Sequence, residues 1–77
     1  MLRAWTQREL AILEILMQKA GSTVLKEHIK AHLSTLESEV TYNAIEIAVH
    51  RLRKKIEDGG VNIRTLRGLG YLLESKE

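Results

Sequence analysis

The chain has 77 residues, of which 44% are hydrophobic and 29% are charged, and it contains neither cysteine nor proline. This length allows one small domain, which buries only about 60% of the surface of its unfolded chain. No apolar run approaches the ~20 residues of a membrane span, and no signal-peptide core follows the N-terminus, so we expect a cytoplasmic protein with no membrane partner. Without cysteine, a disulfide framework and a thiolate metal site are excluded.

Positive charge is concentrated in one part of a chain whose net charge is +2. Between His50 and Arg67, six cations stand against two acids, whereas the remainder of the chain has a small excess of acids. The six cations are Arg51, Arg53, Lys54, Lys55, Arg64 and Arg67. Such a segment is expected of a surface that binds a polyanion. Cations also favour the C-terminal end of a helix dipole, so charge alone leaves both interpretations open.

The first half of the chain predicts two helices and a loop. Thr6 and Glu9 have the spacing of a capping box, which predicts that a helix starts there. Apolar residues follow at helical spacing, and Gly21 supplies a stop. These residues are Leu10, Leu13, Leu16, Met17 and Ala20. A second, shorter helix is predicted over about residues 26–33, and residues 34–40, which have no clean period, are predicted to form a loop.

The second half predicts a third helix and a β-hairpin. Thr41 is the predicted cap of a helix that ends before Asp58-Gly59-Gly60. One aliphatic stripe runs along this helix, formed by Ile45, Val49, Leu52 and Ile56. Two β-rich runs around LRGLG then indicate a hairpin. Three helices with a terminal hairpin, a mainly α chain with a small β element, is the plan of a winged helix-turn-helix.

The side of the third helix away from the aliphatic stripe combines small or aliphatic residues with cations. At about 100° per residue, this outer side contains Ala44, Ile47, Arg51, Lys54 and Lys55, with Glu46 and Arg53 on one flank. Small residues allow close approach to a DNA major groove, arginine reaches base edges, and flanking cations meet phosphates. We therefore expect this side to face double-stranded DNA.

Four blocks, spread over nearly the whole chain, match the motifs of one family. Thr6, Glu9, Leu10 and Leu13 fit an opening "LT..E..LL" helix, and Gly21, Val24 and Ile29 fit "G.vvs...L". Residues 43–55, NAIEIAVHRLRKK, are similar to "N.vdvhi.rLRkK". Residues 63–71, IRTLRGLGY, are similar to "i.TvRG.GY". Together these blocks resemble the OmpR/PhoB-type effector domains of bacterial two-component response regulators.

The resemblance implies a mechanism and a set of contact residues. A recognition helix over about residues 42–56 would enter the major groove, and a wing over about residues 61–73 would lie at the minor groove. The matching helix positions are Asn43, Ala44, Ile47, Ala48, Arg51 and Arg53, and the matching wing arginine is Arg67. Lys54 and Lys55 complete the expected DNA contacts.

The resemblance also implies partners for a single effector domain over residues 1–77. They are promoter DNA, RNA polymerase through the loop 34–40, and a second copy on repeated half-sites in the full-length regulator. It implies no enzymatic activity and no cofactor.

The sequence departs from the family pattern in three respects. The family's N-terminal sheet is largely missing, since residues 2–5 supply at most the end of its last strand. No phosphorylatable receiver domain is present, which indicates either an excised fragment or a short natural protein. Ala48 and Ser34 stand where many members have histidine and tryptophan.

Other functions compete with DNA binding. A winged-helix module for protein–protein interaction has the same fold but no need for Arg51, Arg53 and Arg67 together. The G-x-G of the hairpin lacks the following helix and third glycine of a nucleotide-binding loop. His28 and His32 share a helix face, but a metal site needs a third ligand. Glu37 and Glu39, in a polar loop, are expected to face solvent rather than act as an acid–base pair.

Overall fold

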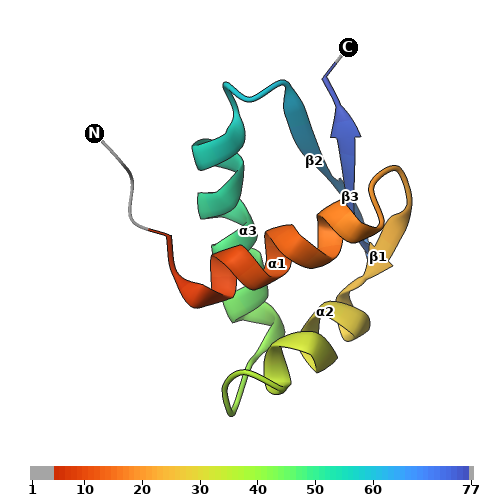
Figure 1. The fold of residues 1–77 in the computed structure, drawn as a ribbon. Helices are drawn as coiled ribbons and strands as arrows, with labels where there is room; N and C mark the ends of the chain where they lie inside the picture. Colours follow the sequence, from red (N-terminus) through yellow and green to blue (C-terminus); the bar gives the residue numbers. More distant parts are fainter. Residues whose placement is uncertain (1–4, 77) are drawn as a thin grey trace.

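The computed structural model describes residues 5–76, which form three helices and a three-stranded sheet (Figure 1). In chain order the elements are α1 (Gln7–Gln18), β1 (Thr23–Leu25), α2 (Lys26–Ser34), α3 (Tyr42–Ile56), β2 (Val61–Leu66) and β3 (Gly70–Ser75). This is the winged-helix fold that the sequence predicts. Of the residues expected to end a family strand, 2–4 lie outside the described part, and Trp5 belongs to no strand.

Helix α1 begins with the predicted capping box. The hydroxyl of Thr6 accepts a hydrogen bond from the backbone N–H of Glu9 at 3.0 Å, and the backbone N–H of Thr6 donates to Oε1 of Glu9 at 2.9 Å. Two of the N–H groups that a helix start leaves without partners are thereby satisfied.

The buried face of α1 differs from the one that its leucine spacing suggests. Ile12, Ile15 and Leu16 are buried, whereas Leu10 is 52% exposed and Met17 is 60% exposed. Apolar residues therefore lie on two faces of this helix. Hydrophobic spacing identifies the helix but does not indicate which of its two apolar faces meets the core.

Helix α3 follows its prediction closely. The hydroxyl of Thr41 accepts a hydrogen bond from the N–H of Ala44 at 3.1 Å, as an N-cap residue does. Ile45, Val49 and Leu52 are each at most 1% exposed, and Ile56 lies partly buried at the edge of the core. The predicted aliphatic stripe is thus the surface by which α3 packs on the rest of the domain.

The predicted hairpin exists, but it belongs to a larger sheet. Strands β2 and β3 pair antiparallel, and β3 also pairs antiparallel with β1, so that the strand order is β1-β3-β2. Strand β1 is only three residues long and has a single buried side chain, Val24, which is too little to show an alternating pattern. Gly70 allows the close pairing, because a Cβ there would lie 2.0 Å from the carbonyl oxygen of Val24.

The helices and the sheet enclose one core. Helix α1 packs against both α2 and α3. The sheet contacts α3 through β2 and α1 through β3, while β1 runs directly into α2 (Figure 1). Tyr71 on β3 is buried in the same cluster as Val49 on α3, as expected of a residue that packs the wing on that helix. Burial raises the pKa of the Tyr71 hydroxyl, and the nearby Glu46 carboxylate raises it further.

We expect Leu52→Ala to destabilise the domain by about 2–5 kcal/mol, since Leu52 is fully buried and its loss leaves a cavity. Thermal unfolding followed by circular dichroism measures this cost. Leu10→Ala is the matched control, because it removes the same atoms from an exposed position of α1 and should have a much smaller effect. Equal losses for both variants would contradict the assignment of the core.

Candidate nucleic-acid interface

The outer face of α3 presents the combination that the sequence predicts. Asn43, Ile47 and Arg51 are exposed, and Ala44 is partly buried. A shallow hollow of about 290 Å³ lies between α3 and the start of α1, where Glu37 also borders it; its α3 side is lined by Ala44, Ile47, Ala48 and Arg51. Arg51 forms no hydrogen bond or ion pair with any residue in the described range 5–76. Its guanidinium group is therefore available to a ligand.

Ala48, one of the helix positions that match the family's DNA contacts, is largely buried. It is 5% exposed and belongs to the core cluster, between Ile45 and Leu52 of the aliphatic stripe. On a helix, a residue three positions after Ile45 and four before Leu52 shares their side. Ala48 nevertheless lines the same hollow as Ile47 and Arg51, and its contact with DNA stays a prediction.

Lys55 turns toward α1 instead of outward. Its Nζ lies 2.7 Å from Oε1 of Glu9 and 5.3 Å from the centroid of the Trp5 ring, and its side chain is 15% exposed. The expected position of Lys55 on the outer face is therefore wrong, and this lysine ties the end of α3 to the start of α1. Lys54, the neighbouring lysine, is exposed.

Glu9 is the buried partner of this ion pair. It is 1% exposed, and its Oε1 accepts from both Lys55 and the backbone of Thr6. Burial raises the pKa of the carboxyl group, but the hydrogen bonds from Lys55 and Thr6 outweigh burial, so the net pKa is lowered. The sequence explains Glu9 as part of the capping box and does not indicate that it also forms an ion pair with Lys55.

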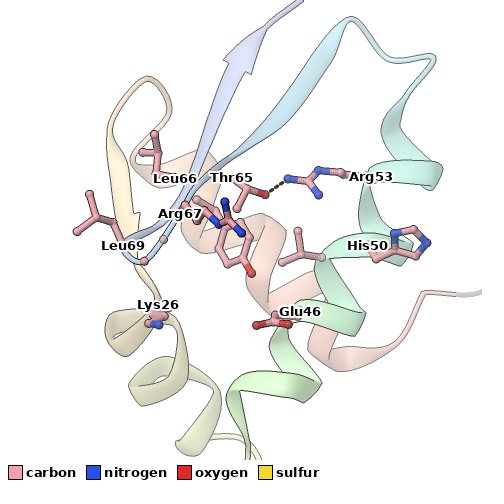
Figure 2. A pocket seen from close by; sticks show the side chains of 12 residues that line it. Lys26, Glu46, His50, Arg53, Thr65, Leu66, Arg67 and Leu69 are labelled. Atoms are coloured by element: carbon pink, nitrogen blue, oxygen red, sulfur yellow. Dashed lines mark hydrogen bonds between the residues drawn. The ribbon is translucent and has the colours of Figure 1, made fainter.

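Arg53 joins α3 to the wing. Its Nε donates to the carbonyl oxygen of Ile63 at 2.9 Å, and its Nη2 donates to the hydroxyl of Thr65 (Figure 2). Because both acceptors are on β2, the guanidinium group sets the position of the hairpin relative to the helix. Arg53 lies on the predicted flank of α3, and its hydrogen bonds to β2 are an additional structural role that was not predicted.

Arg67 lies at the exposed tip of the hairpin. The N–H of Leu69 donates to the carbonyl oxygen of Leu66 at 2.8 Å, which closes a tight turn, and Gly68 takes a φ of 78° that favours glycine. This turn forms one wall of a groove of about 550 Å³, and α3 forms the other. Charged side chains along the groove are Lys26, Glu46, Arg53 and Arg67, and the titratable His50 and Tyr71 also line it (Figure 2). Sequence reasoning missed Lys26 and His50 as members of this surface.

The loop between α2 and α3 is held against α1. Arg8 donates from Nε and Nη2 to the two carboxylate oxygens of Glu37, which is 32% exposed. The expectation that Glu37 simply faces solvent is corrected, whereas Glu39 is exposed. Within residues 5–76, no three His, Cys, Asp or Glu side chains gather as metal ligands, and no helix is long and apolar enough to cross a membrane.

Comparison with known proteins identifies the family. The family described as "Transcriptional regulatory protein, C terminal" matches residues 3–73. The chain belongs to this family, the OmpR/PhoB-type C-terminal domains of two-component transcriptional regulators. It is 44% identical over 71 residues to the transcriptional regulatory protein TctD of Salmonella typhimurium, and 45% identical over 69 residues to QseB of Escherichia coli O157:H7.

Solved structures of the family have the same fold. The C-terminal domain of the nisin resistance regulator NsrR is similar with a TM-score of 0.83 and 34% identity, over 97% of this chain and 78% of that one. The DNA-binding domain of the response regulator AdeR, in complex with an intercistronic region, is similar in fold, with a TM-score of 0.76 at 23% identity over the same shares.

The chain corresponds to one part of its curated relatives. It spans about a third of their length, since the match covers 92% of this chain but 32% of TctD, and 90% of this chain but 31% of QseB.

We expect the domain to lose stability as the pH falls below about 4. The pKa of Glu9 is lower in the folded state than its unfolded value of about 4.3, so its stabilising contribution is complete above that value. It is then lost as the pH falls through the folded pKa. Denaturant unfolding at a series of pH values measures this loss, which Glu9→Gln should reduce.

The control for this prediction is Glu37→Gln. Arg8 also lowers the pKa of Glu37, but this pair is substantially exposed, so solvent screens it. A pH dependence that is reduced more by Glu37→Gln than by Glu9→Gln would contradict the importance of the buried pair.

Proposed function

We propose that the domain binds double-stranded DNA, with the outer face of α3 in the major groove and the wing at the adjacent minor groove. The observation that carries this proposal is the exposed guanidinium of Arg51, which has no partner among residues 5–76 and lies beside Ile47 and the small Ala44. Arginine bonds bidentately to O6 and N7 of guanine, while apolar side chains contact the thymine methyl group.

The remaining contacts divide by chemistry. Asn43 and Arg51 are suited to base edges, because both are exposed on the outer face of α3. Lys54, exposed near the end of the helix, is suited to phosphates, as are the N–H groups of Arg53 that no residue in the range 5–76 accepts. Arg67, at the hairpin tip, is suited to a narrow minor groove with its enhanced negative potential.

At the level of the whole protein, we propose that residues 1–77 are the output domain of a two-component response regulator in the cytoplasm. The family and the regulators TctD and QseB support this role. In such a regulator the domain binds DNA rather than catalysing a reaction. Two copies would occupy repeated half-sites, and the α2–α3 loop, held by Arg8 and Glu37, would contact RNA polymerase.

A protein–protein interaction module is the second candidate, and one observation favours it. Leu10 and Met17 form an exposed apolar strip along α1 with Leu13 at its border. This strip offers apolar contact area, but it lies on α1. A partner bound there would not explain why Arg51 on α3 is exposed and has no partner in the described part of the chain. DNA binding accounts for both arginines, Arg51 and Arg67, and is therefore the better proposal.

We expect Arg51→Ala and Arg67→Ala to weaken binding in different ways. Arg51→Ala should cost about 1–3 kcal/mol on the preferred site and flatten discrimination at one base pair. Arg67→Ala should weaken binding most where A·T-rich sequence flanks the major-groove site. Competition binding with a randomised duplex library at one salt concentration measures both effects. If Arg51→Ala lowers affinity equally for every sequence, Arg51 contacts phosphate and does not read bases.

A further inference from the structure

A cluster of two lysines and a tyrosine lies where α2 meets α3, and only one of the three, Lys26, lines the groove described above. Lys26 and Lys30 are one turn apart on α2, and Tyr42 is the first residue of α3. The Nζ of Lys26 lies 5.3 Å from the centroid of the Tyr42 ring, and the Nζ of Lys30 lies 4.8 Å from it. The ammonium groups of both lysines therefore make cation–π contacts with the same Tyr42 ring.

This arrangement holds positive charge without neutralising it. Attraction to the electron-rich face of an aromatic ring orients a cation but supplies no negative charge. Neither Lys26 nor Lys30 forms an ion pair with a carboxylate anywhere in the described part of the chain. Two like charges on one ring repel each other, and a bound anion would relieve that repulsion. Tyr42 is 37% exposed, so an anion can reach the cluster from solvent.

The cluster is continuous with the groove between α3 and the wing. The backbone N–H of Lys26 donates to the carbonyl oxygen of Leu69 at 3.0 Å, which fixes the start of α2 beside the hairpin turn. The side chain of Lys26 lines the same groove as His50 and Arg67 (Figure 2). A duplex strand that meets Arg67 at the wing would therefore run past Lys26.

We propose that Lys26, Lys30 and Tyr42 form a seat for a backbone phosphate of the DNA duplex, on the strand beside the major groove that α3 enters. This inference rests on the proposed function and adds a sequence-independent anchor to it. Tyr42 restricts the lysine side chains before binding, so less conformational freedom is lost when the phosphate arrives. The anchor sets the orientation of α3 on the duplex and reads no base.

The test measures the salt dependence of binding to a duplex selected from the randomised library. A lysine that neutralises a phosphate contributes about −0.9 to the slope of log affinity against log salt, so Lys30→Gln should make the slope shallower by up to that amount. Base preferences in the library should not change. Lys19→Gln is the matched control, since Lys19 is an exposed lysine at the end of α1 with the same charge.

Two further measurements make the assignment specific. Tyr42→Leu keeps an apolar side chain but removes the ring, and it should weaken binding at fixed salt by several-fold without changing base preference. Ethylation interference locates the phosphate, because ethylation removes its charge. One ethylated phosphate that impairs binding of the unsubstituted chain should have a smaller effect on Lys30→Gln, in which only Lys26 remains to bind it.

The outcomes distinguish this inference from the proposed function. If the unsubstituted chain binds DNA with a steep salt slope and Lys30→Gln leaves that slope unchanged, the phosphate seat is wrong and DNA binding stands. Equal changes for Lys30→Gln and Lys19→Gln would reveal a general effect of net charge, which also overturns the seat. If the unsubstituted chain binds no duplex at all, the proposed function itself fails.

Discussion

Burial of one aliphatic stripe on α3 decides how the rest of this domain is arranged. Ile45, Val49 and Leu52 are almost completely removed from solvent, so the rotation of the helix about its axis is fixed. Ile47 and Arg51 are then forced outward by the helical period alone. The packing of the aliphatic stripe is therefore enough to expose the face of α3 that is suited to a DNA groove. No other interaction is needed to orient this face.

Two cations complete this arrangement by holding other elements to α3. Lys55 binds the buried carboxylate of Glu9 at the start of α1, and Arg53 binds the backbone and a side chain of β2. Both bonds come from the last turns of the helix, where positive charge also favours the helix dipole. The cations at the C-terminal end of α3 therefore also stabilise the fold. Fewer of them are available to bind DNA than the charge of this segment suggests.

The sequence predicts the helices, the hairpin and the outward positions of Ile47 and Arg51, because these features depend on capping residues and an apolar stripe that are close together in the chain. Prediction failed where partners are distant in the chain. Lys55 meets Glu9 across 46 positions, and β1 has too few residues to show a pattern. The buried face of α1 could not be predicted either. The helix has two apolar faces, and only the packing of α3 and the sheet decides which of them is buried.

The most direct test of DNA binding through α3 and the wing is a chemical-shift map. Backbone amide signals of the ¹⁵N-labelled domain would be followed by NMR during titration with the selected duplex. We predict the largest changes at Asn43, Ile47, Arg51 and Arg67, with those of Leu10 and Met17 on α1 unchanged. Changes confined to the apolar strip of α1, with α3 and the wing silent, would contradict the account.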